Sequence, residues 1–317
     1  FNIFYSSRPS KIMNNPKIHV YLMCRNRIDY AKECIYSIKK QEYINYELTV
    51  SDNSTNSFLY KSLLEEFPDI NIKRRLPPLS AIEHQNIILD EIESDYFVVF
   101  HDDDLMMPNY LSRMVELLIE YPQCSAIAPN GIIIKDNIYT KRAFAKKLTS
   151  VVYHENGESI FDHYMSFKKN FHAPFPGYMY QSKFTLKIRY NVEEGGIYND
   201  VAFLMKLSNN APVLWVPDKL IYYRDHHAAG RYVFDFKGKL SLTRFVQKFS
   251  KFHKSHKNVI QFKLNYYIKY LRLYGINLVK TKRTRRIRIL SMFIAIIFIK
   301  RPIYLFRLLI LKTNFFY

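Results

Sequence analysis

Apolar runs alternate with amphipathic stretches along the first third of the chain, and this alternation predicts the fold class. The runs are rich in β-branched and aromatic residues, as is typical of buried strands, and the stretches between them repeat apolar positions at helical spacing. In order, we predict strands at 18–23, 46–51, 70–73 and 96–101, and helices at 28–41, up to Phe67, and at 80–91. This alternation indicates an α/β fold, with a Rossmann-like, mainly parallel sheet flanked by helices.

The pattern is less regular after residue 104. Pro108 suits the first turn of a helix that continues to Tyr121, because the missing N–H of proline would be unpaired there. We expect a hairpin with Asp136-Asn137 at its turn and a helix over 198–207. Further strands are predicted at 124–128, 213–216 and 220–223, and residues 141–180 are expected to form a shaped loop.

Polar turns follow three of the predicted strands, at residues 24–27, 52–56 and 102–104. Ligands of open α/β sheets collect at the carboxyl ends of the strands, so we expect these turns to face one cleft. The third turn is Asp102-Asp103-Asp104, whose charges repel one another unless a cation lies among them. Mg²⁺ typically takes one or two carboxylates together with substrate phosphates. The turn therefore indicates a divalent metal site, with a solvated acidic turn as the alternative.

Charge divides the chain of 317 residues into two parts. Of its 47 Lys and Arg residues, 20 lie in 236–317, which contains no Asp or Glu, and the other 27 stand against 28 acidic residues. We predict an N-terminal extension at 1–16, a globular catalytic domain at 17–235 and a basic helical region at 236–317. The three cysteines show neither metal-ligand nor disulfide-framework spacing.

The basic region contains one strongly apolar run, Ile289–Ile299, bounded by basic residues. As a helix its 11 residues would be about 16 Å long, whereas a bilayer core is roughly 30 Å thick. We therefore expect the region to associate with an anionic membrane surface without crossing the bilayer. A helical subdomain packed on the globular domain is the alternative, but it does not explain the missing acids. The interleaved aromatic and basic residues of this region also suit a basic nucleic-acid-binding protein, a further alternative. No standard nucleic-acid motif is present, however, and we expect no nucleic-acid partner.

Five short motifs occur in an order that resembles the family 2 glycosyltransferases, inverting enzymes with a GT-A fold. They are Met23-Cys24-Arg25-Asn26, Val50-Ser51-Asp52-Asn53-Ser54-Thr55, Phe100-His101-Asp102-Asp103-Asp104, Gly195-Gly196-Ile197-Tyr198-Asn199-Asp200 and Tyr223-Arg224-Asp225-His226. The third carries the Asp-x-Asp signature of the family. The resemblance covers about residues 17–230 and leaves the basic region outside. The second motif is one residue shorter than the common form, and Asn199 stands in place of a Glu.

For the donor, the resemblance implies a nucleotide-diphosphate sugar, most commonly a UDP-sugar, bound with Mn²⁺ or Mg²⁺. It implies that Asp52 hydrogen-bonds the nucleobase and that the turn containing Cys24 and Asn26 packs against the base. Asp102 would lie near the ribose and the metal, and Asp103 also counts among the donor-binding residues.

For the chemistry, the resemblance implies that Asp104 holds the metal and that His226 is a further metal or diphosphate ligand. Asp200 is expected to be the base that deprotonates the acceptor hydroxyl, although its position also suits a helix cap. Glu193 or Glu194 is the alternative base. A packed, hydrogen-bonded role is expected for His101 rather than metal ligation.

The resemblance also implies a glycan or polyprenyl-linked acceptor, as used in polysaccharide biosynthesis. With the basic region, it predicts a peripheral enzyme at the cytoplasmic face of a bacterial inner membrane. A catalytically inactive GT-A scaffold is the alternative, because Asn199 replaces the usual Glu.

Overall fold

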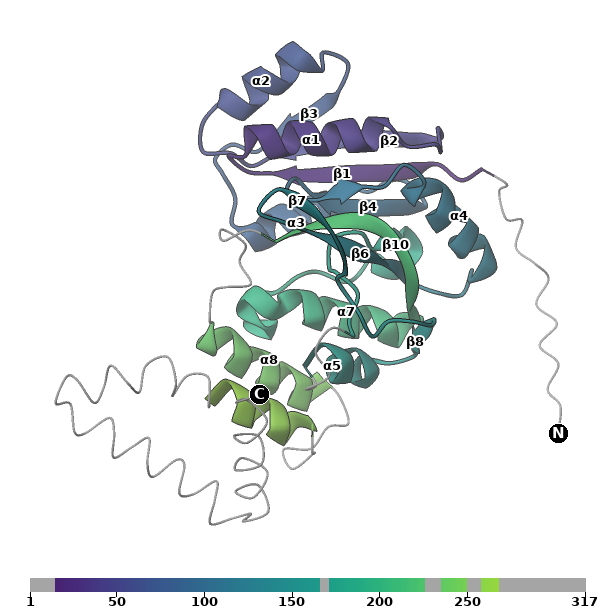
Figure 1. Cartoon of the computed structure of the whole chain (residues 1–317). Coiled ribbons are helices and arrows are strands. Elements are labelled where there is room, and N and C mark those ends of the chain that lie inside the picture. The colour runs from purple at the N-terminus through teal and green to yellow at the C-terminus, as the bar shows by residue number, and fades with distance from the viewer. Residues whose placement is uncertain (1–14, 166–170, 226–234, 250–257, 268–317) are drawn as a thin grey trace. The chain divides into compact units, whose positions relative to one another are not determined.

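Strands and helices alternate much as the hydrophobic pattern predicts (Figure 1). The computed structural model describes residues 15–165, 171–225, 235–249 and 258–267. The elements up to residue 120 are β1 (Ile18–Cys24), α1 (Ile28–Lys39), β2 (Tyr46–Asp52), α2 (Phe58–Glu66), β3 (Asn71–Arg74), α3 (Ala81–Asp90), β4 (Tyr96–His101), β5 (Leu105–Met106) and α4 (Tyr110–Glu120). The later elements are β6 (Ala126–Lys135), β7 (Ile138–Ala143), β8 (Val152–His154), α5 (Gly157–Met165), β9 (Met179–Gln181), α6 (Ser182–Thr185), η1 (Val192–Glu194), η2 (Gly196–Tyr198), α7 (Asn199–Asn210), β10 (Val213–Asp225) and α8 (Phe236–Phe249).

The strands form one sheet in the order β3-β2-β1-β4-β9-β6-β10-β5, with β7 paired to β6 and β8 paired to β10. Strands β3, β2, β1 and β4 are parallel to one another, as are β6 and β10. Strand β9 runs antiparallel between β4 and β6 and joins the two parallel groups. The expectation of a mainly parallel sheet therefore holds for the first half only, and the complete sheet is mixed.

Parallel register places the ends of three strands at one edge of the sheet. Cys24 of β1 is level with Asp52 of β2, and Met23 is level with His101 of β4. The chain leaves all three strands at this edge, so the turns that follow them are neighbours. The predicted convergence of the polar turns is confirmed for the turns after β1, β2 and β4.

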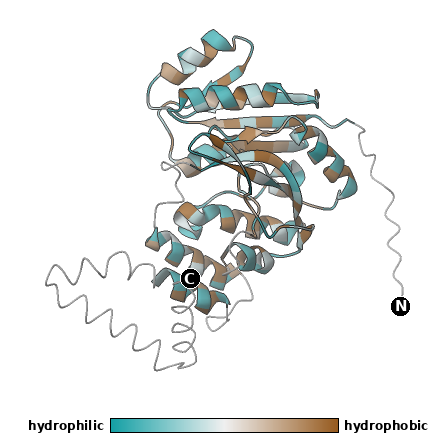
Figure 2. Cartoon of the chain, viewed as in Figure 1, coloured by the Kyte–Doolittle hydropathy of each residue, from teal (hydrophilic) through white to brown (hydrophobic). Residues whose placement is uncertain are grey.

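Apolar side chains of the parallel strands and of two helices hold this edge in place. Strand β1 is buried along nearly its whole length, as expected of a strand covered on both faces. The main core includes Val20, Leu22, Val98 and Phe100 on the strands, Cys34 and Ile35 on α1, and Met114 and Leu118 on α4. Figure 2 shows largely hydrophobic strands, whereas α1 and α2 alternate between hydrophobic and hydrophilic residues.

Three local expectations need correction. The two strands predicted at 213–216 and 220–223 are one strand, β10, because the segment around Lys219 that resembles a turn is an irregularity within it. Helix α4 begins at Tyr110 rather than at Pro108, because β5 first pairs with β10. The segment 141–180 is not a loop throughout, since it contains β8, α5 and β9.

The expected hairpin is confirmed. Strands β6 and β7 pair antiparallel, and their turn is Asp136-Asn137, with positive φ of 49° and 61°. Two consecutive left-handed residues are what a tight two-residue hairpin turn requires, and Asp and Asn tolerate them.

The chain divides into two compact units, Phe1–Ile260 and Gln261–Tyr317, and every labelled element lies in the first. Helix α8, which the sequence assigned to the basic region, contacts η1, η2 and α7.

The apolar run Ile289–Ile299 lies outside the described residues. Among the helices that the structure does describe, none combines the length and apolarity that crossing a membrane would need.

Candidate active site

Asn26 joins the turn after β1 to the turn after β2. Its backbone is left-handed, with φ of 58°, a conformation that asparagine tolerates. Its N–H donates to Ser54 Oγ at 2.8 Å, and its Oδ1 accepts from Thr55 N at 3.0 Å. Cys24, by contrast, belongs to the core, and burial raises the pKa of its thiol well above the usual value. The turn therefore presents backbone rather than a reactive thiol.

Asp52 is fully buried at the end of β2 and keeps one carboxylate oxygen without a hydrogen bond. Its Oδ1 accepts from Ser54 N at 2.9 Å, whereas no described residue hydrogen-bonds its Oδ2. Arg74 Nε, 4.0 Å from that oxygen, is likewise buried and without a hydrogen bond among the described residues. Buried polar atoms are nearly always paired, so this acceptor and donor indicate a ligand edge with an N–H beside a carbonyl. Nucleobases such as uracil carry an edge of this kind.

Asp102 is buried after β4 and is held by the turn that follows β1. Arg25 N donates to its Oδ2 at 3.0 Å, and the Arg27 guanidinium pairs with its Oδ1. Burial raises the pKa of Asp102 to about 6, although Arg27 opposes the shift. Arg27 also contacts Asp103 Oδ2 at 2.7 Å. The cation that this acidic turn needs is therefore supplied in part by the chain itself, a role that sequence reasoning missed.

Asp104 is buried beside Arg224 of β10. The backbone N–H of Arg224 donates to Asp104 Oδ1 at 2.7 Å, and its Nε donates to the carbonyl of Asp103 at 2.9 Å. The guanidinium also contacts Glu33 Oε2 at 2.6 Å and lies 4.3 Å from the centre of the Tyr30 ring. Burial, and then the charge of Asp103, raise the pKa of Asp104 well above its usual value. Arg224 thus fixes the acidic turn from the side of α1.

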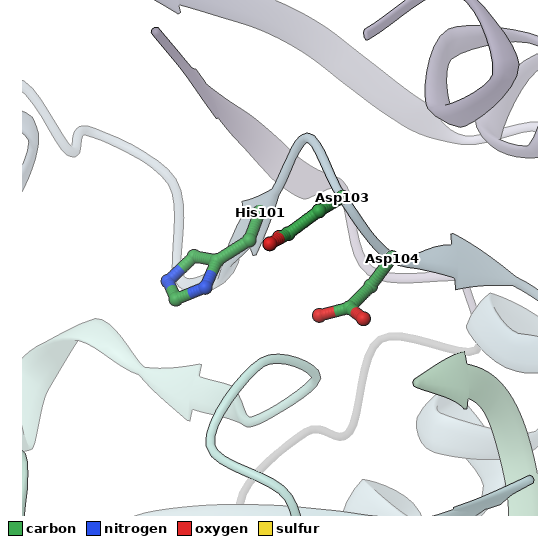
Figure 3. A group of neighbouring side chains, drawn as sticks. All are labelled: His101, Asp103 and Asp104. Atoms are coloured by element: carbon green, nitrogen blue, oxygen red, sulfur yellow. The ribbon is translucent and has the colours of Figure 1, made fainter. Parts of the chain in front are cut away.

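A metal ion would find three ligands in this turn. One ligand atom each from His101, Asp103 and Asp104 lies within 4.8 Å of the others, and Figure 3 shows the side chains on one side of the turn. Two carboxylates with one imidazole suit a divalent ion such as Mn²⁺. Asp102, also expected near the metal, is instead turned to Arg25 and Arg27. The sequence favours a packed role for His101 over ligation, yet its position directly before the acidic run brings its imidazole close to both carboxylates.

Asp200 lies in the first turn of α7 and is partly buried. Val201 N donates to its Oδ1 at 2.8 Å. Burial raises the pKa of Asp200 to about 6, so its carboxylate is a stronger base than a solvated one. The wall beside it is aromatic: burial and then the charge of Asp200 raise the pKa of Tyr190, and the same charge acts on Tyr178.

The segment before β9 connects Asp200 to the acidic turn. Because β9 runs antiparallel to β4, this segment passes the end of β4. The ring of Phe175 lies 6.5 Å from that of His101 and 5.9 Å from that of Tyr178, between centroids. Tyr178 is in turn held by Trp215 Nε1 at 2.6 Å. A short aromatic wall therefore runs from the metal ligands toward the candidate base.

The other expected residues are placed as follows. Glu194 forms an ion pair with Lys206 at 2.5 Å, which weakens its case as a base, and Glu193 is exposed. Asn199, which replaces the family's Glu, donates to the carbonyl of Gly196 at 2.7 Å and so holds the turn before α7. His226 lies outside the described residues.

Comparisons with known proteins find a family and relatives by sequence, and further relatives by fold. The model of the family described as glycosyl transferase family 2 matches residues 20–185, just over half of the chain. A protein of Escherichia coli (strain K12), named as a candidate colanic acid biosynthesis glycosyl transferase, WcaA, is 26% identical over 140 residues. That match covers 41% of this chain and 48% of the relative, so the chain spans about half the length of that relative.

Two solved structures share the fold at low identity. TarS of S. aureus, as residues 1–349 in complex with UDP-GlcNAc, gives a TM-score of 0.60 at 18% identity, over 85% of this chain and 77% of that chain. The mannosyltransferase PcManGT from Pyrobaculum calidifontis, in complex with GDP-Man and Mn²⁺, gives 0.55 at 13% identity, over 92% and 83%. At these identities the likeness shows a shared GT-A-like fold.

We predict that Arg27→Gln destabilises the protein, because it leaves the buried Asp102 without its cation. Hydrogen bonds to charged groups contribute about 1.5–3 kcal/mol, so urea unfolding at neutral pH should show a loss of that order. The loss should shrink as the pH falls through about 6, since protonated Asp102 no longer needs a cation. Arg113→Gln is the control: this arginine pairs with Glu116 and Asp218 on the surface, so its loss should be below about 1 kcal/mol. Equal losses for both variants, or a loss independent of pH, would contradict the role given to Arg27.

Proposed function

The chain belongs to glycosyl transferase family 2, and from that premise we propose that it is a metal-dependent inverting glycosyltransferase. It transfers a sugar from a nucleotide-diphosphate sugar, in our proposal a UDP-sugar, to a hydroxyl group of a glycan or polyprenyl-linked acceptor. The observation that carries the proposal is the Oδ2 atom of buried Asp52, which accepts no hydrogen bond from the described residues and lies next to the acidic turn at the same sheet edge.

In this proposal the nucleobase of the donor binds at Asp52. Asp52 Oδ2 accepts the N–H of the nucleobase, and Arg74 Nε donates to the carbonyl beside it. The backbone of the turn at Cys24 and Asn26 borders the same position. Uracil provides this pair of groups, and so does guanine, so the UDP assignment rests on the resemblance to the family rather than on these contacts.

The acidic turn serves the diphosphate. His101, Asp103 and Asp104 would hold a divalent ion, and when bound that ion stabilises the negative charge of the departing diphosphate. Arg27, which pairs with Asp102 and Asp103, would lie beside the same charge. Arg224 holds the turn in position through the hydrogen bond from its backbone N–H to Asp104.

Asp200 accepts the proton of the attacking hydroxyl. Its raised pKa of about 6 keeps it ionised at neutral pH while making it a better proton acceptor than an exposed aspartate. Asn199 holds the turn and takes no part in this step. The raised pKa of Asp200, and its electrostatic effect on Tyr178 and Tyr190, support activity over the alternative of an inactive scaffold.

We predict that Asp104→Asn abolishes metal-dependent nucleotide binding but preserves the fold. The amide oxygen can still accept from Arg224 N, whereas the ligand charge is lost. Titration of UDP in Mn²⁺ should show an affinity at least about tenfold weaker, or about 1.4 kcal/mol. Asp136→Asn, which removes a carboxylate from the exposed hairpin turn, is the matched control and should bind as the parent does. Turnover that persists unchanged in excess chelator would rule out metal dependence.

We also predict that Asp200→Asn lowers the turnover number by a factor of about 10²–10⁴, with donor binding intact. In the parent enzyme the turnover number at saturating donor should rise with pH up to about 6 and then level off, because the base must be deprotonated. Glu194→Gln should change turnover little, since the carboxylate of Glu194 forms an ion pair with Lys206. If Glu194→Gln abolishes turnover and Asp200→Asn does not, the assignment is wrong.

Finally, we propose that residues 236–317 place the enzyme peripherally on an anionic membrane, the cytoplasmic face of a bacterial inner membrane. Full-length protein should sediment with vesicles containing phosphatidylglycerol at low salt and be released by high salt. Replacing Arg283, Arg285, Arg286 and Arg288 by Gln should weaken binding by about 1 kcal/mol per charge that lies near the surface. Protein that remains in the supernatant with anionic vesicles at low salt would refute the proposal.

A further inference from the structure

A cavity of about 600 Å³ lies on the side of Arg224 that faces α1. Its walls come from α1, the β5–Pro108 segment, the β6–β7 hairpin and β10, and we call it the α1 cavity. It is lined by Glu33, Tyr36, Ser37, Lys40, Leu105, Met106, Pro108, Asn137, Tyr139, Tyr222 and Arg224. None of the described residues assigned to nucleobase binding, metal binding or proton abstraction lines this cavity. A cavity of this volume can hold a small molecule, and the donor site does not account for it.

Three tyrosines line the α1 cavity, beside Leu105, Met106 and Pro108. Tyr139 and Tyr222 meet edge to face, with ring centres 5.0 Å apart, and Tyr139 stays 59% exposed on a hairpin strand. The hydroxyl of Tyr36 donates to Glu66 on α2 at 2.6 Å, so the cavity receives its ring rather than its hydroxyl. Exposed aromatic rings that gather around a cavity indicate a ligand with a flat apolar face.

The polar side chains of the α1 cavity include both donors and acceptors. Glu33 and Ser37 share a face of α1, and Lys40 is its C-cap residue, three positions further on. The hydroxyl of Ser37 already donates to the carbonyl of Cys34 and accepts from Met106 N. Lys40 has no ion-pair partner among the described residues, and Glu33 uses one oxygen, Oε2, for Arg224. Asn137, which accepts from Arg224 at 3.0 Å, adds an amide from the hairpin turn. The cavity thus offers hydrogen bonds of both senses but only one unpaired cation.

We infer that the α1 cavity binds a saccharide. A pyranose ring combines an apolar C–H face, which packs on aromatic rings, with hydroxyl groups that both donate and accept. A diphosphate would require more than one unpaired cation, and an alkyl chain would leave Glu33, Lys40 and Asn137 without partners. If the proposed function holds, this saccharide is a part of the acceptor glycan away from the reacting hydroxyl. Arg224 lines the cavity and holds Asp104, so bound saccharide would contact the residue that positions the metal turn.

The test is an array of bacterial oligosaccharides probed with labelled full-length protein, without nucleotide or metal. We expect binding to at least one saccharide, and Tyr139→Ala and Lys40→Met should each weaken it about tenfold. Ile138→Ala removes another exposed apolar side chain from the same strand, outside the cavity lining, and should leave binding unchanged.

Asp52→Asn separates this inference from the proposed function. It should lose UDP binding but keep saccharide binding, whereas Tyr139→Ala should keep UDP binding. Failure of UDP binding in the parent protein would therefore count against the donor site alone. The inference is overturned if no saccharide binds, if Tyr139→Ala binds as well as Ile138→Ala, or if decanol displaces the saccharide and binds in its place.

Discussion

The cost of burying carboxylates at the end of a sheet is the constraint on which the rest of this structure depends. Asp52, Asp102 and Asp104 are each at most 2% exposed. A buried charge is tolerated only when hydrogen bonds or opposite charges replace the water it has lost. Here Ser54, Arg25 and Arg224 supply backbone N–H groups, and Arg27 supplies its guanidinium group. The register of β1, β2 and β4 brings these partners together.

These partners compensate the buried carboxylates only in part, and the groups left without full compensation are available to bind a ligand. Asp52 keeps an oxygen without a hydrogen bond, and burial keeps the pKa of Asp102 and Asp104 above the usual range. A nucleobase N–H and a divalent cation are the groups that would complete the set. Incompletely compensated carboxylates cost stability, and a donor that completes their partners would regain that free energy as binding energy, a common relation between stability and function at active sites.

The sequence predicted the parts of the site that follow strand ends, because strands end where apolar runs give way to polar residues. It therefore located Asp52 and the acidic run, and the strands that precede them, whereas Asp200 at the start of α7 was found through the resemblance to the family. It did not predict the mixed sheet, because β9 is only three residues long and its pairing depends on contacts distant in sequence. Arg27 and Arg224 stood inside or beside the quoted motifs, but only the fold shows which carboxylates they contact. The α1 cavity is formed by α1, the hairpin and β10, which are distant in sequence, so no local pattern could predict it.

The central claim is that the acidic turn and Asp52 form one site for a metal and a nucleoside diphosphate. Thermal unfolding of the full chain with UDP and GDP, each with and without Mn²⁺, tests it most directly. The account predicts that nucleotide and Mn²⁺ together stabilise the protein by more than the sum of their separate effects. At 100 times the dissociation constant the stabilisation should reach about 2.7 kcal/mol. An unfolding temperature that neither nucleotide changes, with or without Mn²⁺, would contradict the account.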